Sequence, residues 1–218
     1  MTRPPGNATP SLPMRCATEW TLIDTETTGL FAPIHVVEVA AVRMRGWEPT
    51  GETYQAFLDH DIEIPAEAEA IHGYDRAFLR RHGAAPREVH RAFRDFLGDR
   101  PICAHNLSYD LDRCLLPEWA RLRAGTTHVR GFCTVKLARR TLPELKFHGM
   151  GLLTRKYHLT RAKAHAALAD AQATAQLVSQ VLAPRLRGTA FEDFAALVRF
   201  SEMERRRAVK ALGAGPAQ

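Results

Sequence analysis

Short apolar runs alternate with polar turns along the first quarter of the chain. Residues 19–24, 36–44 and 52–58 are rich in apolar and β-branched side chains and predict three strands. The connection between the last two carries Gly46 and Pro49, which are typical of tight turns. Because the connections are short, the three strands should form an antiparallel meander.

Helical periodicity replaces this alternation in the middle of the chain. Residues 75–81 and 86–97 carry apolar side chains three or four positions apart and predict two helices. A short apolar run ending at His105 predicts a fourth strand, and Asn106 is placed to cap the helix that follows. We expect Pro117 to interrupt that helix.

The remaining elements complete an α/β pattern. Residues 129–134 predict a fifth strand, residues 134–141 a helix, and the segment after His165 a long helix ending near Leu182. Beyond Pro184 an amphipathic stripe follows, built from Phe191, Phe194, Leu197, Val198 and Phe200. This segment could pack on the core, bind a partner protein or extend a basic surface, and packing is the simplest expectation.

The composition divides the chain into three parts. Residues 1–17 carry four prolines and offer little to bury, which predicts a flexible N-terminal arm. Residues 18–183 contain the strands and helices of one predicted domain, and residues 184–218 form a predicted C-terminal helical extension.

Charge and cysteine content narrow the function classes. The 218 residues include 30 Lys and Arg against 24 Asp and Glu, a net charge of +6, which favours a polyanionic partner. The four cysteines form no Cys-x-x-Cys pair, so we expect reduced, buried thiols rather than a disulfide scaffold or a zinc ribbon. No apolar run approaches the ~18 residues that span a bilayer, and the N-terminus has no apolar signal core. These features predict a soluble, cytoplasmic protein without a membrane partner.

Two acids lie at the end of the first predicted strand. Because strand side chains alternate faces, Asp24 and Glu26 point the same way, with their Cα atoms roughly 6–7 Å apart. Both could therefore contact one cluster of hard cations. Taken alone, such a pair next to Thr-Thr-Gly more often caps a turn.

Two further stretches carry acids near predicted helix starts. Asp110 lies one turn into its helix, and Asp170 lies five residues after His165. Five helical positions rotate a side chain by roughly 140°, so His165 should lie on the loop or first turn before the helix that fixes Asp170. Each residue has an ordinary alternative, as a helix-dipole partner, an exposed histidine or a surface charge.

Positive charge is concentrated between residues 136 and 165. Eight cations stand there against the single acid Glu144: Lys136, Arg139, Arg140, Lys146, Arg155, Lys156, Arg161 and Lys163. A solvated face often has this character, but the position just before His165 is also where a phosphate backbone would need neutralising.

Together these motifs resemble a known enzyme family. Asp24-x-Glu26, His105-Asn106-x-x-Tyr109-Asp110 and His165-x(4)-Asp170 occur in the order found in the DEDDh 3′-to-5′ exonucleases, which are similar to the proofreading subunit of bacterial DNA polymerase III. The resemblance covers about residues 18–183, and Ile71-His72-Gly73 also resembles a segment of these enzymes. Tyr109 stands where the family usually has Phe.

The resemblance implies a ribonuclease H-like fold with a central mixed five-stranded sheet flanked by helices. It implies that Asp24, Glu26, Asp110 and Asp170 hold two divalent ions, Mg²⁺ or Mn²⁺, while His165 acts as the general base. The product would be a nucleoside 5′-monophosphate released from a 3′ end. Substrate contacts are implied for Thr27, Thr28, Gly29, Leu30, His72, His105 and Asn106.

Three functions remain open from the sequence. DNA is the favoured substrate because Asp-Thr-Glu-Thr-Thr-Gly resembles the proofreading enzymes more than the oligoribonuclease branch. The alternatives are the same chemistry on RNA, and a non-catalytic polymerase accessory that binds nucleic acid. The complete set of five catalytic-type residues argues against the last. A polymerase partner or self-association is left undetermined.

Overall fold

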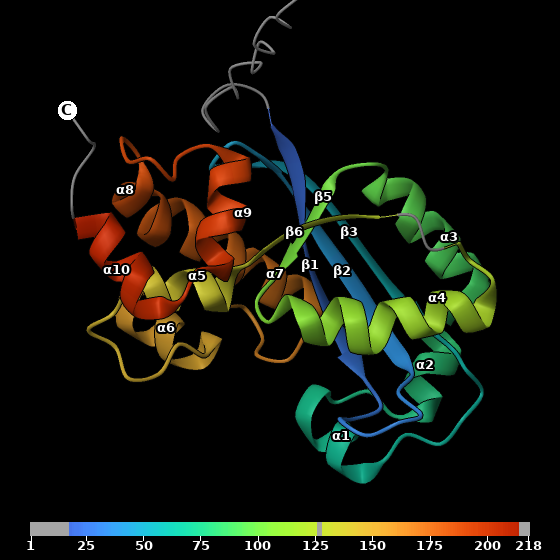
Figure 1. Cartoon of the computed structure of the whole chain (residues 1–218). Helices are drawn as coiled ribbons and strands as arrows, with labels where there is room; N and C mark the ends of the chain where they lie inside the picture. Colours follow the sequence, from blue (N-terminus) through green and yellow to red (C-terminus); the bar gives the residue numbers. More distant parts are fainter. Residues whose placement is uncertain (1–17, 126–127, 214–218) are drawn as a thin grey trace, which may run out of the picture.

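A mixed six-stranded sheet forms the centre of the molecule (Figure 1). The structure is a computed structural model that describes residues 18–125 and 128–213; the predicted arm 1–17 and residues 214–218 of the predicted extension lie outside the described residues. The strand order is β4-β3-β2-β1-β5-β6. Their bounds are β1 Glu19–Thr27, β2 Val36–Arg45, β3 Glu48–Leu58, β4 Gly83–Ala84, β5 Pro101–Ala104 and β6 Val129–Cys133.

The predicted meander is confirmed. β1, β2 and β3 pair antiparallel, whereas β5 runs parallel to β1 and β6 runs parallel to β5. The turn between β2 and β3 is Gly46-Trp47, and Pro49 lies inside β3 rather than in the turn. This part of β3 pairs only with β2, so the missing amide of Pro49 disrupts no second ladder.

The prediction of five strands is wrong by one. β4 has two residues, which pair parallel with Phe57 and Leu58, and a strand this short has no readable alternation. Gly83 fits there because it lacks a side chain: a Cβ would lie 2.6 Å from the Leu79 carbonyl oxygen.

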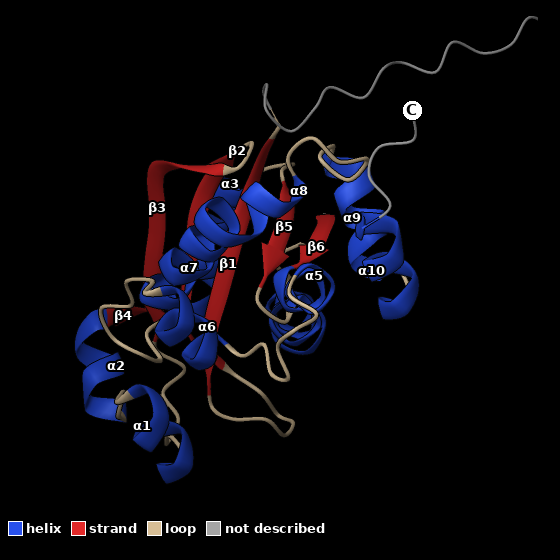
Figure 2. Cartoon of the chain, turned by 90° about the vertical axis from the view of Figure 1, so that its left-hand side faces the viewer, coloured by secondary structure: helices blue, strands red, loops and turns tan. Residues whose placement is uncertain are grey.

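Helices cover both faces of the sheet (Figure 2). Trp20 and Leu22 of β1 pack into the apolar core on one face, whereas Ile23 packs into the core on the other face. The helices of the first core are α5 Thr134–Thr141, α6 Met150–Tyr157, α7 Ala167–Gln176, η2 Leu177–Leu182, α8 Ala183–Leu186, α9 Phe194–Glu202 and α10 Arg205–Gly213. Those of the second are α3 Pro86–Leu97, the π-helix η1 Ser108–Leu115 and α4 Leu116–Leu122.

Two prolines lie within helical segments that continue through them. The prediction that Pro117 interrupts its helix is wrong, because η1 runs directly into α4. At this junction the amide of Leu116 bonds to the carbonyl of Leu111, five residues back, and such a widened turn accommodates the missing proline amide. Pro184 likewise lies in the first turn of α8, so the helical segment crosses the boundary that we placed after residue 183.

A short helix, α1 Ala66–His72, is absent from our predictions. It buries only Ala68 and His72, too few apolar positions to show a period. It lies beside α2 Arg76–His82 at the end of the sheet where β1 finishes.

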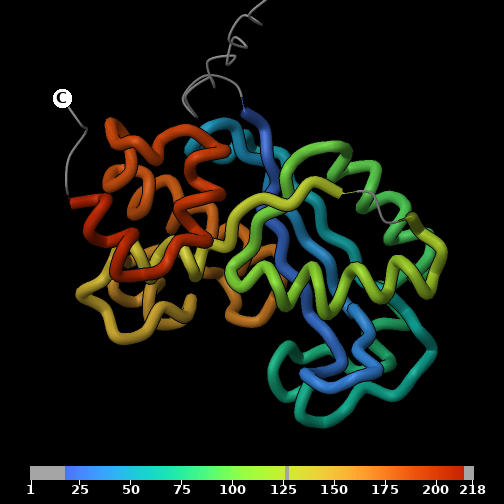
Figure 3. Tube along the Cα trace, viewed as in Figure 1, coloured from blue at the N-terminus to red at the C-terminus, as the bar shows by residue number. Residues whose placement is uncertain are grey.

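The C-terminal stripe packs on the core, as the amphipathic pattern predicts. Leu197, Phe200 and Ala208 are buried in the same cluster as Trp20. The trace in Figure 3 shows this segment in red beside the yellow segment that contains α5 and α6. The predicted free thiols are confirmed for Cys103, Cys114 and Cys133, and Cys16 lies outside the described residues. Among the described helices none combines the length and apolarity needed to cross a membrane.

Candidate active site

Residues from four segments meet at the end of β1. One cavity of about 230 Å³ is lined by the five predicted catalytic residues Asp24, Glu26, Asp110, His165 and Asp170. β1 supplies the first two, η1 the third and α7 the last, and the histidine lies on the turn before α7. The sheet strands β1 and β5 are parallel here, so their carboxyl ends open on the same edge.

His165 stands at the rim of the cavity. It is exposed, lies outside any helix as predicted, and has a φ of +58°. Its backbone amide donates a 3.3 Å hydrogen bond to Oδ2 of Asp170. Ligand-type atoms of Glu26, His165 and Asp170 all lie within 4.8 Å of one another.

Thr25 holds Asp110 in place. The Thr25 backbone amide (3.1 Å) and its hydroxyl (2.9 Å) both donate to Oδ1 of Asp110. Thr25 points to the face of β1 opposite to Asp24 and Glu26, so one strand delivers two acids and positions a third.

Burial raises the pKa of three of these carboxyls, and neighbouring negative charges raise the pKa of two of them further. The pKa of Asp24 lies well above its ordinary value because of burial and the nearby charges of Asp110 and Asp170. Burial and the charge of Glu38 raise the pKa of Glu26 to about 8. Burial raises the pKa of Asp110 to about 7, against the opposing effect of the Thr25 hydrogen bonds.

Glu38 is a further acid of the site that our sequence reasoning missed. It is fully buried on β2, directly opposite Glu26 in the register. Its carboxylate accepts hydrogen bonds from the Tyr74 hydroxyl (2.8 Å) and from the amide of Ala167 at the start of α7 (3.0 Å). A lone acid in the apolar run Val36–Met44 was the signal that could have revealed it.

Arg161 belongs to the basic run of the sequence, and in the structure it lines the catalytic cavity. Its guanidinium forms a two-point ion pair with Asp170: Nη2 lies 2.6 Å from Oδ2, and Nε contacts Oδ1. Both side chains are largely buried.

The donor set fits hard divalent cations. Asp24, Glu26, Asp110 and Asp170 offer oxygen atoms only, which Mg²⁺ and Mn²⁺ prefer to softer ligands. In addition to burial, the charges of Asp110 and Asp170 raise the pKa of both Asp24 and Glu26, and added positive charge would oppose that effect.

A second cavity of about 180 Å³ adjoins the first and shares Thr25, Glu26 and Tyr109 with it. Four predicted substrate residues line this second cavity: Thr27, Gly29, Leu30 and His72. The Tyr109 hydroxyl donates to the Gly29 carbonyl (3.0 Å) and lies 2.9 Å from the Thr27 hydroxyl.

Thr28, also predicted to contact substrate, lines neither cavity. Its hydroxyl accepts a hydrogen bond from the His35 amide (3.0 Å), and its own amide donates to the His35 carbonyl (2.9 Å). Thr28 therefore closes the base of the loop between β1 and β2.

His105 and Asn106 line the catalytic cavity and also a third, larger one of about 730 Å³. The His105 ring lies 2.9 Å from both the Thr134 hydroxyl and the His148 carbonyl, and burial lowers its pKa to about 4. The prediction that Asn106 caps the next helix is wrong: its φ is +93°, and its backbone carbonyl, not its side chain, accepts the Tyr109 amide. The rest of the third cavity includes Lys136, Arg139, Lys146 and Phe147.

A family model and several relatives match most of this chain. The model of the exonuclease family matches residues 21–178. The PolC-type DNA polymerase III of Latilactobacillus sakei is 31% identical over 162 residues, which is 73% of this chain but 11% of that protein. A DNA polymerase III subunit epsilon-like protein of Rhodobacter capsulatus is 30% identical over 182 residues, 81% of this chain and 25% of that protein. The chain thus spans about a tenth of the PolC-type relatives and a quarter of the epsilon-like one.

Solved exonucleases share the fold. The zinc-bound complex of E. coli exonuclease I with single-stranded DNA superposes with a TM-score of 0.67 at 18% identity, covering 78% of this chain and 42% of that chain. Exonuclease X in complex with 5′-overhanging duplex DNA superposes with a TM-score of 0.59 at 24% identity, covering 81% of this chain and 98% of that chain. This likeness places the chain among ribonuclease H-like folds.

Proposed function

The chain belongs to the exonuclease family, and from that premise we propose that it is a metal-dependent 3′-to-5′ exonuclease that releases nucleoside 5′-monophosphates from DNA. One observation carries the proposal: four carboxylates and an exposed histidine, from distant parts of the chain, line a single cavity of about 230 Å³. A module that only binds nucleic acid has no need to hold acids together against their mutual repulsion.

Asp24, Glu26, Asp110 and Asp170 would hold two divalent ions, Mg²⁺ or Mn²⁺. When bound, such ions supply Lewis-acid polarisation of the phosphate and lower the pKa of water. The protein's own contribution is to fix the acids: Thr25 orients Asp110, and Glu38 binds the first amide of α7, the helix that carries Asp170.

His165 would take the proton of the attacking water on its ring. Its place on the exposed turn gives the imidazole access to a water above the carboxylates, and the hydrogen bond from its amide to Asp170 ties the turn to the site. Histidine is the side chain that most often serves as a general base.

The adjoining cavities suggest how the strand lies. The terminal nucleotide would enter the cavity formed by Thr27, Gly29, Leu30 and His72, which shares residues with the catalytic cavity. The preceding nucleotides would follow the third cavity, where Lys136, Arg139 and Lys146 neutralise phosphates and Phe147 stacks on a base.

The preference for DNA and the possible partner rest on the relatives. The PolC-type and epsilon-like proteins are named as DNA polymerase III proteins, and solved neighbours hold DNA. We therefore favour DNA over RNA as the substrate, with a polymerase as a candidate partner of this chain.

Matched DNA and RNA oligomers of one sequence, labelled at the 5′ end and incubated with Mg²⁺, test the proposal. We expect a ladder of products shortened from the 3′ end of DNA. Asp170→Ala should abolish shortening while leaving the circular dichroism spectrum unchanged, and His165→Ala should slow it about 10²–10⁴-fold. Faster shortening of RNA would reassign the substrate, and no shortening of either oligomer would refute the enzyme.

A further inference from the structure

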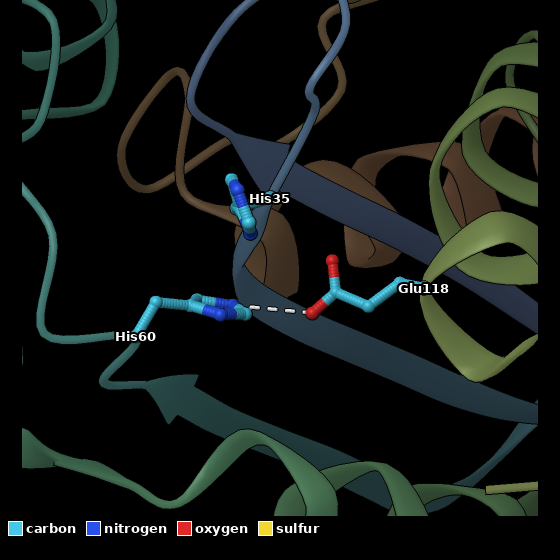
Figure 4. A group of neighbouring side chains, drawn as sticks. All are labelled: His35, His60 and Glu118. Atoms are coloured by element: carbon cyan, nitrogen blue, oxygen red, sulfur yellow. Dashed lines mark ion pairs between the residues drawn. The ribbon is translucent and has the colours of Figure 1, made fainter. Parts of the chain in front are cut away.

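A second group of ligand-type side chains lies beneath the loop between β1 and β2. His35 precedes β2, His60 follows β3, and Glu118 lies on α4. Ligand-type atoms of all three lie within 4.8 Å of one another. Figure 4 shows the His60 ring directed at the Glu118 carboxylate with His35 beside them. These residues come from three segments and line none of the three cavities described above.

Glu118 is held firmly in this group. Its side chain is fully buried, and its Oε1 accepts a hydrogen bond from Nε2 of His90 (3.0 Å). Nε2 of His60 lies 3.1 Å from the same oxygen and 2.8 Å from the Val36 carbonyl oxygen. The Val36 amide donates to Oε2 (2.9 Å). The Trp119 indole in turn donates to Nδ1 of His90 (3.1 Å), which fixes the tautomer of that ring with its proton on Nε2.

A positive group already lies between two of the ligand atoms. Nη2 of Arg121 is 3.0 Å from Nδ1 of His35 and 3.6 Å from Oε2 of Glu118. Nδ1 of His35 therefore presents its lone pair to a cation. The Arg121 side chain is 46% exposed, so its guanidinium can turn toward solvent.

We propose that His35, His60 and Glu118 form a binding site for a zinc-type divalent transition-metal ion, separate from the carboxylate site, which the ion enters as Arg121 swings out. Two imidazoles and one carboxylate are ligands that Zn²⁺ favours, with a fourth position left for water. Oxygen-only sites such as the cavity of Asp24 favour Mg²⁺ or Mn²⁺ instead.

The site needs small adjustments and no new fold. Ligand atoms around a tetrahedral Zn²⁺ lie roughly 3.3 Å apart, so the group has to contract from its present separation of up to 4.8 Å. The His60 ring would carry its proton on Nδ1 and give up the 2.8 Å hydrogen bond from Nε2 to the Val36 carbonyl, so that Nε2 can bind the metal. The hydrogen bonds from His90 and Val36 would stay on Glu118 and hold its orientation, as outer partners of zinc ligands do.

Such an ion would stiffen the loop that carries Thr28, Gly29 and Leu30. The His35 amide donates to the Thr28 hydroxyl and the His35 carbonyl accepts from the Thr28 amide, so fixing the His35 ring also fixes the base of the loop. The metal would thus shape the cavity lined by Gly29 and Leu30 without touching the catalytic acids.

Titration with Co²⁺, followed by its visible absorption bands, tests the site. The titration uses the full chain carrying Asp24→Asn and Asp170→Asn, which weakens binding by the carboxylate cavity. We expect saturable 1:1 binding with bands typical of nitrogen ligands, reversed by Zn²⁺. Since losing an outer partner of a zinc ligand typically costs 10–100-fold in affinity, losing the ligand itself in His35→Gln should cost at least about tenfold.

Two further variants should differ in their Co²⁺ affinity. Arg121→Gln removes the competing cation and should tighten Co²⁺ binding, whereas His82→Gln, an exposed histidine on α2, should leave it unchanged. Zn²⁺ should also slow hydrogen exchange of the Thr28 and His35 amides, but not in His35→Gln. Absence of a saturable spectrum, or equal affinity in His35→Gln, would overturn the proposal and leave Glu118 as the centre of a hydrogen-bonded scaffold. The readout does not involve nuclease activity, so it is independent of the proposed function.

Discussion

Arg161 binds both carboxylate oxygens of Asp170, in the middle of the acidic cavity. The guanidinium also lowers the pKa of Glu26, against the larger effects of burial and neighbouring acids. Arg161 therefore compensates the negative charge that a metal would otherwise compensate, and the two cannot use the same oxygens of Asp170 together.

Arg161→Gln should therefore raise the affinity for Mn²⁺. Removing Arg161 from its buried ion pair with Asp170 lowers the free energy of unfolding of the metal-free protein more than that of the metal-bound protein. By linkage, we expect Mn²⁺ binding at least about tenfold tighter, or roughly 1.4 kcal/mol, together with a lower Tm without metal. Isothermal titration without nucleic acid measures the affinity. Arg155→Gln, an exposed arginine of α6, is the matched control, and unchanged Mn²⁺ affinity in Arg161→Gln would contradict the competition.

Thr25→Val tests how far orientation of Asp110 matters. The valine keeps the shape and the backbone amide bond but loses the hydroxyl that donates to Asp110 at 2.9 Å. A hydrogen bond to a charged group contributes about 1.5–3 kcal/mol, so kcat should fall at least about tenfold with little change in KM. Thr53→Val on the exposed face of β3 is the control. A Thr25→Val enzyme with parental kcat would show that the backbone amide is sufficient.

Strand geometry predicts one part of this site, whereas the convergence of Asp110, His165 and Asp170 on that part was expected from the family resemblance. Alternation alone places Asp24 and Glu26 on one face of β1, and the five-residue spacing excludes a shared helix face for His165 and Asp170. Those inferences need only the local chain.

The parts that were missed depend on tertiary contacts. Glu38 joins the site because β2 pairs with β1 in a register that puts it opposite Glu26, and sequence patterns do not specify register. Arg161 joins the site because its guanidinium reaches Asp170, a contact that its place in the basic run does not indicate. The prediction of a helix break at Pro117 was wrong because the π-type junction accommodates the missing proline amide.

His105 should make the stability of the protein depend on pH below neutrality. Its folded-state pKa of about 4 lies below the ordinary 6.5, so between these values the unfolded chain binds more protons than the folded one. The contribution to the free energy of unfolding is complete above pH 6.5 and is lost as the pH falls through 4, by roughly 3 kcal/mol in total. Urea unfolding at several pH values measures this effect. Between pH 6.5 and 4.5 the free energy of unfolding should fall less for His105→Gln than for the parent. Parallel curves for the two proteins would contradict the burial of a neutral ring.

Phe147 offers the sharpest test of the strand path. Its side chain is 62% exposed beside Lys146, whose ammonium lies 5.4 Å from the ring centre, and both line the cavity that adjoins His105. An aromatic ring this exposed buries little apolar area on folding. Stacking of a base on such a ring contributes about 1–3 kcal/mol to binding. Phe147→Ala should therefore raise KM about 5- to 100-fold for a long single strand, with kcat and Tm unchanged.

The effect of Phe147→Ala should also depend on substrate length. On the proposed path a dinucleotide would end within the catalytic and terminal-nucleotide cavities without reaching the ring, so its KM should not change. Val129→Ala, which truncates another exposed apolar side chain, should alter neither substrate. An equal rise in KM for the dinucleotide and the long strand would mean that Phe147 acts on the catalytic cavity itself. If KM rose for neither substrate, the third cavity would not be part of the strand path. The strand would then leave the catalytic cavity in another direction.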